Sequence, residues 1–146
     1  MKHRKKLLFI TISITLIASF LLISSLSVLL YNLASSYNFP AGTLITWLGF
    51  MGLSLSLYLS VANLRNPKNG LNKLLSYQIK TTIVIAVLWV FISYLLAGNL
   101  SFTFTDKVEF QGGQLAMKIF WTINYALVII PILVLLCYWI LNKIKF

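Results

Sequence analysis

The sequence predicts an all-α integral membrane protein, a bundle of four transmembrane helices in one domain. Apolar residues make up 60% of its 146 residues, charged residues make up 10%, and the mean hydropathy is +0.92. A helix needs about 20 apolar residues to cross about 30 Å of hydrocarbon. Four stretches reach this length and use most of the chain, so no soluble module is expected: Leu7–Leu30, Thr43–Ala62, Leu74–Ala97 and Leu115–Leu141.

The basic residues predict the orientation of this bundle. Of the 12 Lys and Arg residues, four precede the first stretch, three lie between the second and third, a fourth of this group, Lys80, lies near the start of the third, and two follow the fourth. Only Lys107 and Lys118 lie on the other side, beside the chain's two acidic residues, Asp106 and Glu109. Because cytoplasmic loops carry the excess of Lys and Arg, we expect both termini in the cytoplasm, in a multi-pass protein of a bacterial inner membrane.

The net charge of +10 also raises the possibility of a nucleic-acid partner, because basic patches bind phosphate. Here the basic residues gather at the helix ends on one side, where they set the topology and meet anionic headgroups. We therefore expect anionic lipids on the cytoplasmic side as partners, and no nucleic acid.

The first stretch is expected to remain in place as a signal anchor. The basic segment Met1–Lys6 precedes an apolar run of about 24 residues, longer than the 7–15 residues of a signal peptide, and no clear cleavage site follows. Tyr31–Gly42 then contains Asn38, Pro40 and Gly42, which break helices, so this segment is predicted to be a tight outer turn.

The next connection is predicted to lie in the cytoplasm. Arg65–Gly70 contains Pro67 and an Asn-Gly pair, both typical of turns. Asn72–Lys80 is interpreted as an amphipathic run at the membrane interface, from which the Lys80 ammonium reaches the headgroups. In the fourth stretch, Pro131 removes a backbone hydrogen bond and can kink the helix.

The second outer connection contains the one segment with strand character, so a short extended segment is predicted there. In Ser101–Phe110 apolar and polar residues alternate with a period of two. One interpretation is a strand whose phenylalanine face rests on the lipid interface. The other is an edge completed by a partner's sheet, for which the candidate partner residues are Phe102, Phe104, Asp106, Glu109 and Phe110.

Small residues in the second stretch form a candidate helix-packing face. Gly49, Gly52, Ser56 and Ser60 are spaced by three, four and four residues, so they share one side of a helix. Small residues at this spacing let two helices approach closely in a membrane. The face can pack internally, against the first or third helix, or against a second protein, and the sequence leaves both open.

A looser polar group lies toward the outer half of the bundle. Its principal members are Ser93, Tyr94, Asn124 and Tyr125, above Pro131. Convergent polar groups over a kinked helix can form a shallow cavity. The simpler alternative is that each hydroxyl bonds to its own helix backbone and Asn124 bonds to one neighbour.

Few groups in the sequence can support chemistry. The whole sequence has one Cys and one His, and no acidic residue lies within the four stretches. No metal, cofactor or catalytic residue is therefore predicted. We expect a non-catalytic protein that binds another membrane protein or itself through helix packing and the outer loop, as an accessory or assembly subunit or an immunity-type factor. The alternative is a small oligomeric transporter or channel with a polar outer vestibule.

Overall fold

Four long helices form the protein, as the hydropathy predicts. The computed structural model describes residues 2–24, 27–34, 39–105 and 108–144. The long helices are α1 (Lys2–Ile23), α2 (Ala41–Ser60), α4 (Gly70–Ala97) and α5 (Gly113–Ile144). Each is long and apolar enough to cross a membrane. The predictions of an all-α fold and of a multi-pass membrane protein are therefore confirmed at this level.

The first helix ends earlier than predicted. α1 stops at Ile23, and Ser27–Leu30 forms a single 3-10 turn, η1. The apolar part of α1 from Leu7 to Ile23 is about 26 Å long, near the lower limit of about 17 residues for crossing the hydrocarbon, and serines beyond Ile23 compete for backbone hydrogen bonds. The segment predicted as a tight turn instead contains two short strands, β1 (Asn32–Ala34) and β2 (Phe39–Pro40), which pair antiparallel.

The other helix ends lie within a few residues of the prediction, with one difference of substance. Val61 has an extended backbone and separates α2 from the single turn α3 (Ala62–Arg65). α4 begins at Gly70, so Asn72–Lys80 is not a separate interfacial run but the first part of one continuous helix. Its residues Leu75 and Ile79 are buried, and this packing explains why the helix continues there.

The extended segment predicted for the second connection is not found in its described residues. Residues 102–104 form a turn, closed by the Phe104 amide, which donates to the Ser101 carbonyl at 2.8 Å. The side chain of Asn99 causes this change. Its Oδ1 accepts from the amides of Ser101 and Phe102 at 3.1 and 2.9 Å, and Asn side chains that bond backbone amides two or three residues ahead favour turns.

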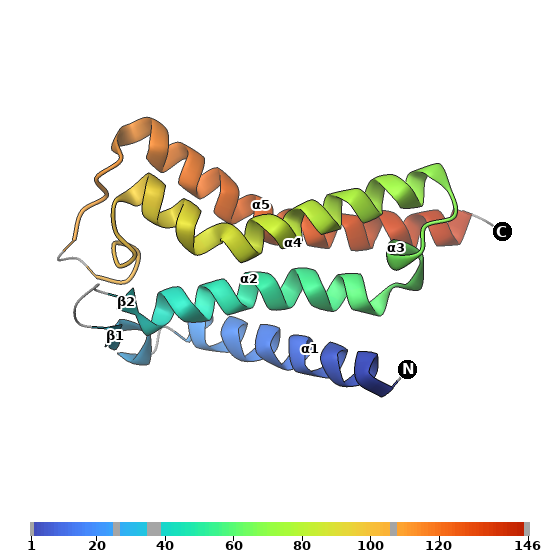
Figure 1. Ribbon diagram of the computed structural model, residues 1–146, viewed down its shortest axis with the longest axis horizontal. Coiled ribbons are helices and arrows are strands. Elements are labelled where there is room, and N and C mark those ends of the chain that lie inside the picture. Colours follow the sequence, from blue (N-terminus) through green and yellow to red (C-terminus); the bar gives the residue numbers. More distant parts are fainter. Residues whose placement is uncertain (1, 25–26, 35–38, 106–107, 145–146) are drawn as a thin grey trace.

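The helices are arranged around α2 (Figure 1). α1 packs along one side of α2, and α4 and α5 cross each other on the other side. Both termini and α3 lie at one end, whereas β1, β2 and the connection 98–112 lie at the opposite end. We call these the basic end and the loop end.

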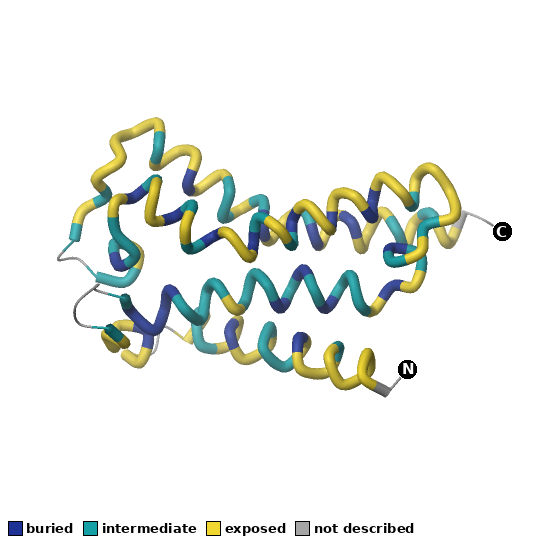
Figure 2. The backbone as a smooth tube through the Cα atoms, in the orientation of Figure 1, coloured by how far each residue is buried: buried dark blue, intermediate teal, exposed yellow. Residues whose placement is uncertain are grey.

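Two apolar clusters hold α2, α4 and α5 together. The cluster near the basic end is built on Val61, Leu64, Leu75, Ile79 and Val134. The cluster nearer the loop end is built on Ala86, Trp89, Phe120 and Leu127. α1 contributes to neither and remains exposed over much of its surface, as Figure 2 shows. The fold is thus a three-helix core with α1 attached to α2, rather than a closed four-helix bundle.

Candidate interaction site at the loop end

The four polar residues predicted to line a cavity do not converge. Tyr94 and Tyr125 point outward, with exposed fractions of 55% and 62%. Asn124 faces the core, where its Oδ1 accepts from Trp89 Nε1 at 2.9 Å and its Nδ2 donates to the Phe120 carbonyl at 2.8 Å. Ser93 is buried, and its hydroxyl has no hydrogen-bond partner among the described residues. Ser93 and Asn124 therefore belong to helix packing, Tyr94 and Tyr125 lie at the outer surface, and the four do not line a common vestibule.

Two of the four small residues on α2 are used inside the chain. A Cβ at Gly52 would lie 2.7 Å from Thr15 Oγ1 and 3.1 Å from the Thr11 carbonyl, and a Cβ at Gly49 would lie 3.1 Å from Ala18 Cβ. Both glycines therefore allow α1 to approach α2 closely. This is the internal packing that the sequence analysis left open beside contact with a second protein. Ser56 is buried, whereas Ser60 is exposed, and each hydroxyl donates to a carbonyl of its own helix.

The phenylalanines of the second connection pack on this chain's own helices. The rings of Phe102 and Phe110 meet edge to face at 5.0 Å, and both contact the ring of Phe120, at 4.9 and 6.0 Å. The ring of Phe104 covers the start of α2, because a Cβ at Gly42 would lie 2.5 Å from it. Phe102 and Phe110 therefore anchor the connection on α5, and Phe104 anchors it on the start of α2.

Asn99 organises the same connection from its other side. Besides accepting from two amides, its side chain donates to the carbonyls of Ala97 and Glu109, at 3.2 and 3.0 Å. The Gln111 amide donates to the Ala97 carbonyl at 3.0 Å, which closes the connection at its base. Glu109 is exposed, and Asp106 lies outside the described residues. Of the candidate acids, only Glu109 is therefore placed at the surface.

A hydrogen bond joins the two connections of the loop end to each other. Thr43, buried in the first turn of α2, donates from Oγ1 to the Leu100 carbonyl at 2.6 Å. Gly98, which ends α4 with a φ of 73°, allows the chain to turn toward α2. We call the resulting surface the loop cap: residues 27–34, 39–43, 98–105 and 108–112.

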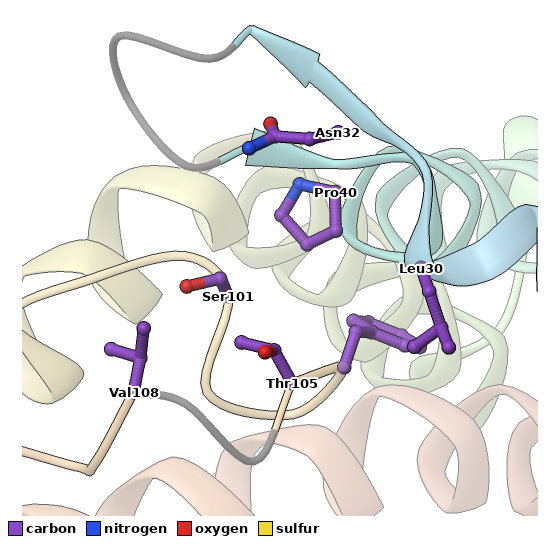
Figure 3. A pocket seen from close by; sticks show the side chains of 7 residues that line it. Leu30, Asn32, Pro40, Ser101, Thr105 and Val108 are labelled. Atoms are coloured by element: carbon purple, nitrogen blue, oxygen red, sulfur yellow. The ribbon is translucent and has the colours of Figure 1, made fainter.

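A cavity of about 460 Å³ lies within the loop cap. It is lined by residues of both connections: Leu30, Asn32, Pro40, Ser101, Phe104, Thr105 and Val108. Figure 3 shows Pro40 and Asn32 on the strand side, facing Ser101, Thr105 and Val108 of the second connection. The lining is mixed, with apolar residues beside polar ones.

Ser101 adds an unusual polar group to this site. It is 3% exposed, and its hydroxyl has no hydrogen-bond partner in the part of the chain that the structure describes. Buried polar groups are usually bonded. Sequence reasoning missed the roles of Ser101, Thr43 and Asn99: Thr43 bonds to a carbonyl 57 residues away, and the burial of Ser101 depends on the fold. Only Asn99, two residues before Ser101, carried a usable signal, that of an Asx turn.

The described residues contain no cluster of three or more His, Cys, Asp or Glu that can hold a metal ion. The lone Cys137 is exposed on α5. No protein-family model matches the chain, and no curated protein or solved structure matches it either.

Proposed function

We propose that this protein is a non-catalytic, multi-pass membrane protein that acts by binding another membrane protein through its loop cap. An accessory or assembly subunit and an immunity-type factor both act in this way. The observation that carries the proposal is the link between the two connections, the bond from Thr43 to the Leu100 carbonyl at 2.6 Å. Such a bond holds a concave surface in one shape, and a surface that is already ordered loses less entropy on binding.

The packing below the loop cap supports a protein partner over a transported solute. Below the loop cap the first turn of α2 is closely packed, because Gly42 and Thr43 are buried and Phe104 lies over Gly42. A transport path requires polar groups through the full membrane depth, whereas Asn124 is bonded within the core and Tyr94 faces outward. A small oligomeric transporter or channel remains the second candidate, and the cavity would be its vestibule.

The proposal includes an orientation. The basic end carries most of the Lys and Arg residues of the sequence, so it is assigned to the cytoplasm and the loop cap to the outer face of a bacterial inner membrane. The partner surface is then an extracytoplasmic segment of another membrane protein. Contacts within the membrane would use faces other than Gly49 and Gly52, since α1 already covers these.

Two matched substitutions in the second connection test the proposal. Val108 lines the cavity, whereas Thr103 is exposed on the same connection and is not among the lining residues. The tagged protein is purified in a gentle detergent from its native membrane, and co-purifying proteins are quantified by mass spectrometry. We expect a stoichiometric membrane protein that is lost from Val108→Glu, because a charge in the cavity is costly to bury, and retained by Thr103→Glu.

Two outcomes would contradict this proposal. Equal recovery of the same proteins with both variants would remove the loop cap as the contact surface. A homo-oligomer that moves a solute into proteoliposomes without any partner would support the transporter. Reporter fusions after Lys68 and after Gly112 test the orientation separately, with the first expected in the cytoplasm and the second outside.

A further inference from the structure

Two lysines and a tyrosine share one exposed face of α4 near the basic end. Lys73, Tyr77 and Lys80 are spaced by four and three residues, so they lie on the same side of the helix. All three are exposed, Tyr77 by 70%. Beyond Lys80 the same face becomes apolar at Val84 and Leu88, which are 56% and 46% exposed.

The way α2 and α4 pack side by side gives the position of Lys80 along the bundle, relative to the end of α2. Trp47 Nε1 donates to the carbonyls of Ala86 and Val87, at 3.0 and 3.2 Å, which sets these residues at one level. From there to the end of α2 at Ser60 is about 20 Å, at 1.5 Å per residue, and the same distance along α4 reaches Lys73. The backbone of Lys80 then lies about 10 Å from the level of the end of α2, toward the loop end.

The side chain of Lys80 turns back from this depth toward the basic end. Its Nζ lies 6.0 Å from the ring centroid of Tyr58, which belongs to the last turn of α2. Lysines inside a membrane extend their ammonium toward the interface in this way. The side chain of Lys80 therefore reaches from α4 to α2 and carries its charge toward the basic end.

Among the described residues, no side-chain carboxylate meets these lysines. The sequence has two acidic residues, and Glu109, the described one, lies in the connection at the loop end, the length of a helix away. A charge at membrane depth is costly unless a counter-charge accompanies it. At the level of Lys73 and Lys80, the anionic group that a membrane itself supplies is the phosphate of a phospholipid.

We propose that this face of α4, beside Tyr58 of α2, binds the headgroup of an anionic phospholipid. The phosphate lies between the ammonium groups of Lys73 and Lys80, the Tyr77 phenol donates to it, and the acyl chains rest on the apolar surface that begins at Val84. The site is at the basic end, so it is independent of the partner contact proposed for the loop cap.

Lipid retention measured by native mass spectrometry tests this site. The protein, purified in detergent, is mixed with phosphatidylglycerol or with phosphatidylcholine, and the fraction that keeps one lipid is compared. We expect retention to favour phosphatidylglycerol, and this preference to fall about five-fold in Lys80→Gln and about thirty-fold when Lys73→Gln is added. Lys80→Arg should keep most of the preference, because it keeps the charge.

Lys118→Gln is the matched control, since it removes the same charge from an exposed position on α5 toward the loop end. We expect it to behave as the wild type, and all variants to keep the same helical circular dichroism. Equal retention of both lipids by the wild type, or an equal loss in Lys118→Gln, would overturn the proposal.

Two further outcomes would replace the lipid with another anion. Displacement of phosphatidylglycerol by millimolar inorganic phosphate would identify a site for free phosphate. An acidic protein that co-purifies only when Lys80 is present, without any lipid preference, would assign the face to a protein partner. Retention of phosphatidylglycerol in the presence of millimolar inorganic phosphate supports the lipid.

Discussion

Replacing Gly52 is expected to push α1 away from α2. A methyl group at this position would lie 2.7 Å from Thr15 Oγ1 and 3.1 Å from the Thr11 carbonyl, whereas ordinary contacts begin near 3.4 Å. Thr15 cannot turn aside freely, because its hydroxyl donates to the Thr11 carbonyl at 2.8 Å. The strain must therefore be relieved by moving α1.

The size of the effect follows from two opposing contributions to the free energy of unfolding. Overpacking a tight interface costs about 1–3 kcal/mol, whereas Gly→Ala in a helix gains about 1 kcal/mol. Gly52→Ala should therefore destabilise the protein by up to about 2 kcal/mol, and Gly52→Leu by more. Gly70→Ala is the control, because a Cβ at Gly70 meets no atom within 4 Å and should change stability little.

A disulfide reports the position of α1 directly. A Cβ at Gly49 would lie 3.1 Å from Ala18 Cβ, close to the 3.5–4.5 Å that disulfides require. The pair Ala18→Cys and Gly49→Cys, in a Cys137→Ser background, should therefore form a cross-link on mild oxidation. Adding Gly52→Leu should lower its yield, and adding Gly70→Ala should not.

One result would contradict the close packing of α1 against Gly52. If Gly52→Leu keeps the full yield of cross-link and unfolds at the same fraction of sodium dodecyl sulfate as Gly70→Ala, then α1 does not depend on the small side chain at position 52.

Two further predictions concern buried polar groups and are measured by the same detergent unfolding. Asn124→Leu should destabilise the protein by about 1–2 kcal/mol, because the Trp89 indole N–H loses its acceptor, and no destabilisation would argue against this bond. Thr43→Val and Ser93→Ala each remove a buried hydroxyl, but only Thr43 has a partner, the Leu100 carbonyl. Thr43→Val should therefore cost about 1–3 kcal/mol and Ser93→Ala should be close to neutral, whereas equal effects would contradict the contrast.

The four membrane-spanning helices were predictable because hydropathy depends on local composition. A run of about 20 apolar residues has few other stable solutions in a membrane. The ends were less predictable, and α1 shows why. Apolar residues continue to Leu30, but a helix ending at Ile23 already spans the hydrocarbon, so the remainder was free to form η1 and to join the loop cap.

The candidate site was less predictable because its contacts are long-range. The spacing of Gly49 and Gly52 predicted a packing face, but only the arrangement of helices decides that α1 occupies it. The alternation around Phe102 and Phe110 resembled a strand, yet both rings turn to Phe120, a residue of the next helix. A local pattern of alternating residues cannot distinguish side chains that face a neighbouring strand from side chains that pack on the following helix.

The bond between Thr43 and the Leu100 carbonyl also sets an order of assembly. These residues are 57 positions apart, with all of α4 between them. During synthesis α1 and α2 can pair as soon as both are inserted, but the loop cap cannot close until α4 has crossed the membrane and returned the chain to the same side. A truncated chain that ends within α4 therefore lacks the concave surface altogether. Any molecule that recognises this surface would distinguish chains in which α4 is already in place from shorter chains, whether or not α5 has followed.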